Sequence, residues 1–243
     1  MRIDILRRKS AASDSYWQSF LYEPAEDAET VATALTRLND TPDLRDMDGK
    51  EAAPIRWECS CLQKKCGACA MVINGRPGLA CDARLSAYKK TIRLEPLRKF
   101  PVVADLIVDR SVLYENLRVL RLWFEGEAVQ HQRASEVGYE ASRCLQCGCC
   151  LDVCPNFEPE GAFFGMAAGV PVSRLLAELP ASGREELSRA YREHVYDGCG
   201  KSLACRNICP AGVDIDGLLV NSNAAAVWKR LLKGKEKHHG KEK

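Results

Sequence analysis

Cysteine is the residue type in this sequence with the greatest capacity for chemistry. The 243-residue chain has thirteen cysteines in three blocks, at 59–81, 144–154 and 199–209. Thiolates bind metals or pair as disulfides, and disulfides persist in oxidising compartments. No apolar export segment follows the basic N-terminus, because Ser13, Asp14 and Ser15 stand where it would begin. An odd number of thiols without an export signal predicts metal binding rather than a disulfide framework.

The first block has the spacing of a plant-type [2Fe–2S] site. Four cysteines follow the pattern C-x4-C-x2-C-x11-C: Cys61, Cys66, Cys69 and Cys81. Gly67 and Ala68 are small, so backbone N–H groups can approach the cluster sulfurs. Zinc is the alternative, but zinc favours two close ligand pairs or added histidine, and this block has one close pair and no histidine nearby. Cys59 is interpreted as a bystander.

The second and third blocks predict two clusters that exchange ligands. The second has the bacterial ferredoxin run C-x2-C-x2-C-x3-C-P, whose last cysteine binds the other cluster of a pair. The third repeats this spacing, with proline again after its last cysteine, as Cys199, Ser202, Cys205 and Cys209. The predicted ligands of a [4Fe–4S] cluster are Cys144, Cys147, Cys150 and Cys209. Those of the second cluster are Cys154, Cys199 and Cys205, and Cys149 is left over.

Ser202 decides the type of the second cluster. It stands where the run requires a cysteine, so one corner iron has no thiolate. A [3Fe–4S] cluster is the natural product of three thiolates. A serine alkoxide is the alternative ligand, but its oxygen is harder than sulfur and rarely deprotonated.

Strands and one helix are predicted to position the first block. Alternating or aromatic-rich segments at 2–9 and 16–22 indicate two strands joined as a hairpin. Apolar residues at helical spacing predict a helix over 31–39. Short strands are predicted at 71–73 and 91–97, with Asn74 and Gly75 as a hairpin turn.

The second half of the chain is predicted to be mostly helical. A domain boundary is placed at Phe100–Pro101, which gives domains at 1–100 and 101–228. Helical spacing of apolar residues begins at Pro101 and runs through Val102 towards Phe124, and it returns at 172–179 and 185–196. The basic tail, 229–243, is predicted to be disordered and solvated, with attraction to an anionic membrane as the alternative.

Composition excludes several functions. The net charge is +2, which argues against a nucleic-acid binder. No uninterrupted apolar run is long enough to cross a bilayer. The chain has four histidines, His131, His194, His238 and His239, and their scatter predicts no catalytic residues in this chain.

With these motifs the sequence resembles the iron–sulfur subunit of succinate dehydrogenase and fumarate reductase. The densest matches run from Cys61 through Asn74–Gly75 to Cys81, and from Arg143 to Gly148. The resemblance implies an α+β chain, with an N-terminal β-grasp [2Fe–2S] domain followed by an α-helical ferredoxin domain. It also implies electron transfer through [2Fe–2S], [4Fe–4S] and [3Fe–4S] clusters, between the FAD of a flavoprotein subunit and a membrane quinone.

The implied partners are that flavoprotein and one or more membrane anchor subunits, which hold the quinone and can carry haem b. The implied location is the cytoplasmic face of the cell membrane, where the chain is held peripherally. Ubiquinone-reducing members of the family have a tryptophan shortly after the cysteine–proline of the second block. They also have a histidine directly after the first cysteine of the third block. In this sequence no tryptophan follows Pro155 closely, and the residue after Cys199 is Gly200. Both departures favour menaquinone as the quinone partner.

Phe157 is a candidate for the quinone pocket, although a lone aromatic residue more often belongs to a core. The alternative function is that of a soluble relative, a thiol-linked fumarate reductase or a heterodisulfide-type electron carrier. Such proteins commonly have further cysteine-rich modules, and none follows Cys209 here. A zinc-bound adaptor is a third reading, and it predicts a colourless protein.

Overall fold

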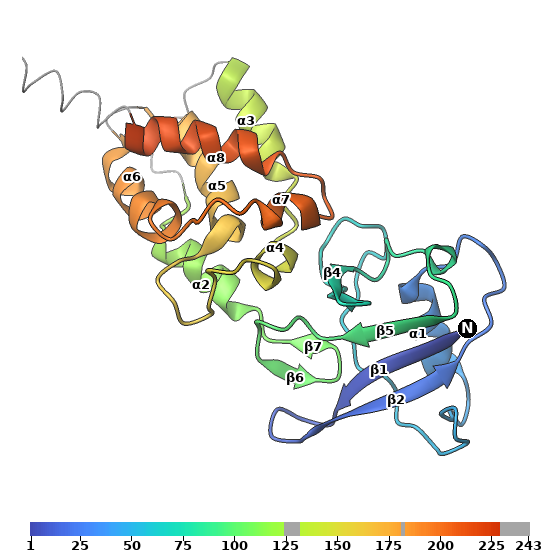
Figure 1. The fold of residues 1–243 in the computed structure, drawn as a ribbon. Coiled ribbons are helices and arrows are strands. Elements are labelled where there is room, and N and C mark those ends of the chain that lie inside the picture. Colours follow the sequence, from blue (N-terminus) through green and yellow to red (C-terminus); the bar gives the residue numbers. More distant parts are fainter. Residues whose placement is uncertain (124–131, 181–182, 229–243) are drawn as a thin grey trace, which may run out of the picture. The chain divides into compact units, whose positions relative to one another are not determined.

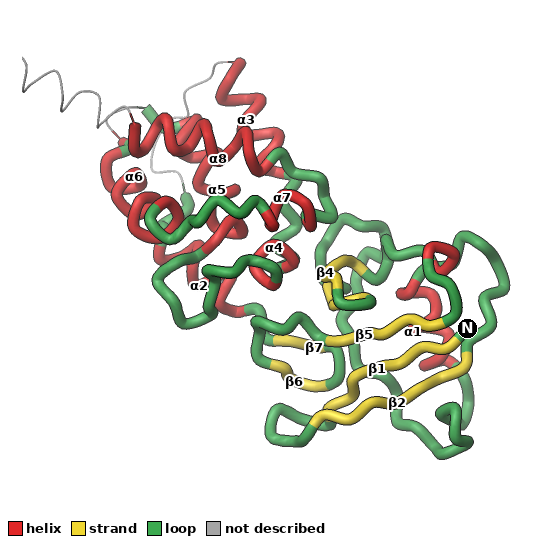
Figure 2. Tube along the Cα trace, in the orientation of Figure 1, coloured by secondary structure: helices red, strands yellow, loops and turns green. Residues whose placement is uncertain are grey.

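A computed structural model describes residues 1–123, 132–180 and 183–228 of the chain. Within them the chain divides into two compact units that interleave in sequence. Unit 1 contains 1–110, 145–153 and 208–210, and unit 2 contains the described parts of 111–144, 154–207 and 211–243. Strands dominate unit 1 and helices dominate unit 2 (Figures 1 and 2), which confirms the predicted α+β class. The predicted tail and Phe124 lie outside the described residues.

Unit 1 is built on a mixed five-stranded sheet in the order β2-β1-β5-β3-β4. Its strands are β1 (Arg2–Arg8), β2 (Ser15–Leu21), β3 (Ala70–Ile73), β4 (Arg76–Leu79) and β5 (Thr91–Glu95). β1 pairs with β2 in antiparallel and with β5 in parallel orientation, with Ile5 opposite Leu94. Ile3, Ile5, Ile92 and Leu94 are almost completely buried, so this register places the apolar residues of the central strands in one core.

The helix α1 (Val31–Asp40) also belongs to unit 1, and Figure 1 shows it behind the sheet. Thr30 caps it, because its hydroxyl accepts the Thr33 N–H at 3.2 Å. The buried residues of the helix recur at helical spacing. A 3₁₀ turn follows at Leu85–Ala87. The strands and the helix predicted for the first hundred residues are therefore confirmed, with ends that differ by one or two residues.

The helix predicted from Pro101 onward is wrong for its first turns. Residues 102–108 form a hairpin, β6 (Val102–Ala104) and β7 (Ile107–Val108), and the helix α2 (Ser111–Val119) begins later. Asp105 turns this hairpin with a φ of 45°. Its carboxylate accepts the backbone N–H groups of Arg8 and Arg56, each at 2.9 Å. These bonds to distant segments outweigh the local helical pattern.

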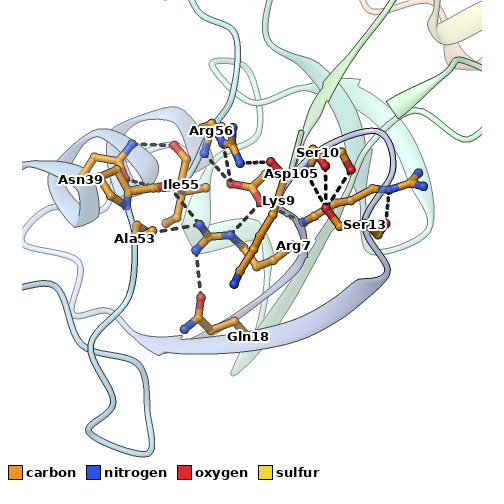
Figure 3. A network of polar contacts seen from close by, with 12 residues as sticks. Arg7, Lys9, Ser10, Ser13, Gln18, Asn39, Ala53, Ile55, Arg56 and Asp105 are labelled. Atoms are coloured by element: carbon orange, nitrogen blue, oxygen red, sulfur yellow. Dashed lines mark hydrogen bonds and ion pairs between the residues drawn. The ribbon is translucent and has the colours of Figure 1, made fainter. Parts of the chain in front are cut away.

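Asp105 also forms a buried ion pair with Arg7 (Figure 3). Arg7 Nε lies 3.0 Å from Asp105 Oδ1, and the two side chains are 3% and 2% exposed. The other nitrogens of Arg7 donate to Gln18 Oε1 and to the carbonyls of Ala53 and Pro54. The pair therefore joins β1, the β6–β7 turn and the segment that leads to the first cysteine block.

Unit 2 is a group of helices around the buried helix α5 (Gly165–Glu178). α3 (Gln132–Ser142) and α8 (Ile215–Asn223) both pack against α5. α6 (Glu185–Tyr191) continues into a π-helical turn at Arg192–Tyr196, and a second π-helical turn, Ala224–Trp228, follows α8. The Tyr191 hydroxyl donates to Asn223 Oδ1 at 2.7 Å and joins α6 to α8. The predicted helices at 172–179 and 185–196 are confirmed, and the first begins earlier than predicted.

Candidate metal centres

The first cysteine loop curls so that its backbone N–H groups face thiols. Leu62, Lys64 and Gly67 have positive φ values of 52°, 59° and 75°. The N–H groups of Gln63 and Lys65 each lie 3.3 Å from Cys61 Sγ. The Gln63 N–H, followed by that of Lys65, lowers the pKa of Cys61 to about 7. Such bonds favour a thiolate and lower the cost of binding metal there.

The β3–β4 hairpin returns the fourth cysteine to this loop. Asn74 and Gly75 turn the hairpin with φ values of 48° and 80°, as predicted. Ala80 N–H then donates to Cys69 O at 3.0 Å, which places Cys81 beside Cys69. Lys64 N–H lies 3.3 Å from Cys81 Sγ. Burial and the neighbouring Cys81 thiol raise the pKa of Cys69 to about 12.

The four thiols of the first block are thus neighbours: the Cys66 thiol bonds to Cys61, and Cys69 contacts Cys81. Four thiols with backbone donors on their sulfurs form a donor set that fits a [2Fe–2S] cluster. Cys59 is exposed at the edge of this loop. Its role as a bystander stays a prediction.

The second run is divided between the units. Leu145–Val153, with Cys147 and Cys150, belongs to unit 1, and so does Ile208–Pro210 with Cys209. Cys144 directly precedes this segment and is counted with unit 2. Gln146 and Gly148 have φ values of 50° and 86°, and the short helix α4 (Cys149–Asp152) begins after Gly148. Asp152 accepts the Lys99 N–H at 3.1 Å and ties α4 to the segment after β5.

Cys149, the surplus thiol of the second run, is completely buried. Its hydrogen bond to the Cys147 thiol lowers the pKa of Cys147 to about 7. The same bond, followed by burial, raises the pKa of Cys149 itself. A protonated thiol beside a thiolate is a hydrogen-bond donor to that sulfur, which fits a neighbour of a ligand.

The first three positions of the third run, Cys199, Ser202 and Cys205, lie with Cys154 in unit 2. Burial, together with nearby Cys154 and Cys199, raises the pKa of Cys205 to about 11, so these three thiols lie close together. Asn156 Nδ2 donates to Gly198 O at 2.7 Å and joins the segment after Cys154 to the residue before Cys199. The helix α7 (Ala204–Ile208) follows. Ser202 is exposed between Lys201 and Leu203, whose φ values are 57° and 55°. Three thiols and one serine fit the donor set expected of a three-iron cluster.

The remaining candidate residues have structural environments. Phe157 is completely buried, which agrees with a core residue, and its place in a quinone pocket stays a prediction. His194 stacks on Phe164 with ring centroids 4.2 Å apart, and its Nδ1 lies 2.9 Å from Ala162 O. His131, His238 and His239 lie outside the described residues. In the described part of the chain no three side chains of His, Cys, Asp or Glu converge on a single metal ion.

Arg110 contacts the cysteine loops, although the spacing of the cysteines does not predict its involvement. Arg110 donates to the carbonyls of Gly67 and Ala68, inside the first cysteine loop. It also donates to the Cys147 carbonyl at 3.3 Å. An arginine 29 residues after Cys81 has no motif of its own, and only the folded chain brings it to these carbonyls.

The fold and the three cysteine sets define a ferredoxin-type iron–sulfur protein with a [2Fe–2S] module and a dicluster module. Family models agree: residues 2–115 match the 2Fe-2S iron-sulfur cluster binding domain, and residues 140–213 match the 4Fe-4S dicluster domain. The chain belongs to the family of iron–sulfur subunits of succinate dehydrogenase and fumarate reductase, as the following relatives show.

The succinate dehydrogenase iron-sulfur subunit of Bacillus subtilis is 32% identical over 226 residues, covering 88% of each chain. The fumarate reductase iron-sulfur subunit of Escherichia coli O6:H1 is 25% identical over 225 residues, with the same coverage. A chain in the Mycobacterium smegmatis Sdh1 complex in the apo form has the same fold, with a TM-score of 0.72 and 24% identity over 93% of this chain and 95% of that chain. The predicted family, the order of the two ferredoxin domains, and the presence of [2Fe–2S] and [4Fe–4S] modules are thereby confirmed.

Proposed function

We propose that this chain is the electron-transfer subunit of a membrane-bound succinate dehydrogenase or fumarate reductase. It passes electrons between the FAD of a flavoprotein subunit and a membrane quinone. The proximity of Cys154 and Cys199 to Cys205, with Ser202 at the second position of the run, carries the proposal most directly. A three-thiol site in a chain that also has [2Fe–2S] and [4Fe–4S] modules supports the set of three clusters that the family resemblance implies.

The proposed ligand sets follow the three runs. Cys61, Cys66, Cys69 and Cys81 hold the [2Fe–2S] cluster, and their proximity supports this set. Cys144, Cys147, Cys150 and Cys209 hold the [4Fe–4S] cluster, and the grouping of 145–153 with 208–210 supports three of the four. Cys154, Cys199 and Cys205 hold the [3Fe–4S] cluster. When bound, the clusters supply one-electron redox centres.

The residues of this chain prepare those sites rather than perform carbon chemistry. Backbone N–H groups of the first loop donate to Cys61 and Cys81, and buried Cys149 donates to Cys147. These bonds stabilise the thiolates and tune the cluster potentials. The interconversion of succinate and fumarate is then assigned to the flavoprotein subunit.

The proposed partners are the flavoprotein and membrane anchor subunits, and the proposed location is the cytoplasmic face of the cell membrane. No helix in the described ranges has the length and apolar character needed to cross a bilayer. The absence of tryptophan after Pro155 and of histidine after Cys199 favours menaquinone as the acceptor.

Purification of the intact complex from membranes tests the proposal. We expect a brown complex with iron and acid-labile sulfide, anchor chains and bound menaquinone. The oxidised complex should give a near-isotropic three-iron EPR signal at low temperature. Recovery wholly from the soluble fraction, without anchor chains, would favour the soluble relative. Zinc in place of iron and sulfide would refute the cluster assignment.

A further inference from the structure

Arg110 joins the loops of two proposed clusters within unit 1. One guanidinium nitrogen, Nη1, lies 3.0 Å from Gly67 O and 3.3 Å from Cys147 O. The other, Nη2, lies 3.1 Å from Ala68 O. Gly67 and Ala68 stand between two proposed [2Fe–2S] ligands, and Cys147 is a proposed [4Fe–4S] ligand. A planar guanidinium with five N–H donors can satisfy all of these carbonyls at once, which a lysine ammonium cannot do with the same geometry.

Gly67 shows how closely the two loops approach. A Cβ at this position would lie 2.7 Å from Leu145 O and 2.9 Å from Cys147 Cβ, and its φ of 75° already disfavours other residues. Only glycine therefore allows the [2Fe–2S] loop to contact the second run at this distance. Arg110 donates to carbonyls of both loops at this contact.

The charge of Arg110 is partly withdrawn from water. Its side chain is 14% exposed, and it forms an ion pair with the more exposed carboxylate of Glu58. The guanidinium nitrogen Nη1 lies 3.3 Å from the carbonyl oxygen of Cys147, so the positive charge lies beside a proposed [4Fe–4S] ligand. A positive charge near a cluster stabilises the reduced form, because reduction adds negative charge there.

We propose that Arg110 is a positioning residue that fixes the separation of the [2Fe–2S] and [4Fe–4S] clusters and raises the potential of the cluster bound by Cys147. This inference rests on the proposed cluster assignment. Its hydrogen bonds hold the two loops together, and its charge favours the electron on the cluster bound by Cys147. Arg110 binds neither substrate nor iron.

Two substitutions separate geometry from charge. Arg110→Lys keeps the charge but loses the simultaneous bonds to three carbonyls, whereas Arg110→Gln loses both. Arg118→Gln is the control, because it removes an arginine that is 76% exposed and bonds only to Glu115 among the described contacts. Each variant is purified as the intact membrane complex. The measurements are iron and sulfide content, EPR-monitored redox titration of each cluster, and the magnetic interaction between the two reduced clusters.

We expect Arg110→Gln to lower the potential of the cluster bound by Cys147 and to change the magnetic interaction between the clusters. Arg110→Lys should keep most of that potential while still changing the interaction. Arg118→Gln should match the wild type in both. If Arg110→Gln does not assemble, the Arg110→Lys complex still tests the positioning role.

An unchanged potential in Arg110→Gln, or an unchanged magnetic interaction in Arg110→Lys, would overturn the inference. These results leave the proposed function intact, because the wild-type complex would still show both clusters. A wild-type complex without [2Fe–2S] and [4Fe–4S] signals would instead refute the proposed function itself.

Discussion

Ser202 occupies the same backbone setting as Cys147. Each is the second position of its run, and each stands between two residues of positive φ: Gln146 (50°) and Gly148 (86°), or Lys201 (57°) and Leu203 (55°). The third run therefore keeps the curled backbone of a cluster-binding loop, although a hydroxyl stands at its second position. Leu203 supports this reading. A leucine at positive φ is strained, and such strain is retained where a loop has to curl for its function.

This equivalence predicts that Ser202→Cys converts the three-iron site into a four-iron site. The backbone already presents position 202 as Cys147 is presented, so a thiolate there can hold the missing iron. The near-isotropic EPR signal of the oxidised complex should disappear, and iron content should rise. Ser202→Ala is the matched control and should keep the signal. Persistence of the three-iron signal in Ser202→Cys would contradict the assignment of position 202 as the place of the missing ligand.

The two cysteines at the start of the first block should differ in importance. Cys61 receives two backbone N–H groups, whereas Cys59 is exposed. We expect Cys61→Ser to lose or strongly perturb the [2Fe–2S] cluster, since oxygen is a poorer ligand for it than thiolate. Cys59→Ser should retain full iron and sulfide content. Loss of the two-iron EPR signal in Cys59→Ser would show that Cys59 is a ligand.

The buried pair of Arg7 and Asp105 should be costly to break. Asp105→Asn leaves the Arg7 charge buried, and removing one partner of such a pair costs about 3–5 kcal/mol. Asparagine tolerates the left-handed backbone at this position, so the loss of stability reflects the removed charge rather than backbone strain. The effect is measured by thermal unfolding of the complex, which is monitored through the loss of cluster absorbance. Asp48→Asn, on an exposed turn, is the control and should stay within about 0.5 kcal/mol of the wild type.

Iron removal should loosen the cysteine loops and spare the sheet. β1 and β5 bury their own apolar core, whereas the loops contain several residues at positive φ, and the proposed metal–thiolate bonds would hold them in place. After oxidative chelation, amide exchange should accelerate in 61–69 and 199–205, while Ile3, Ile5 and Ile92 stay protected. Equal acceleration in the sheet would show that the clusters stabilise the whole of unit 1.

The sequence alone was sufficient for the cysteine runs and most of the first domain. The spacing of neighbouring cysteines within a run is a local property, because the loop must curl for their thiols to approach one proposed cluster, and the Asn74–Gly75 turn is likewise local. Hydrophobic periodicity predicted β1, β2 and α1 for the same reason. It failed over 102–108, where the bonds of Asp105 to Arg8 and Arg56 replace a helix with a hairpin.

Only the tertiary structure decided which distant groups serve the centres. The sequence gives Arg110 no motif, because its partners Gly67 and Cys147 lie 43 and 37 residues away and meet it only after folding. The burial of Cys149 against Cys147 could likewise not be predicted from the sequence, since spacing alone marks Cys149 as a surplus cysteine. Spacing determines which atoms can bind a cluster. Packing determines the charges and hydrogen bonds around it, because these come from segments that are remote along the chain.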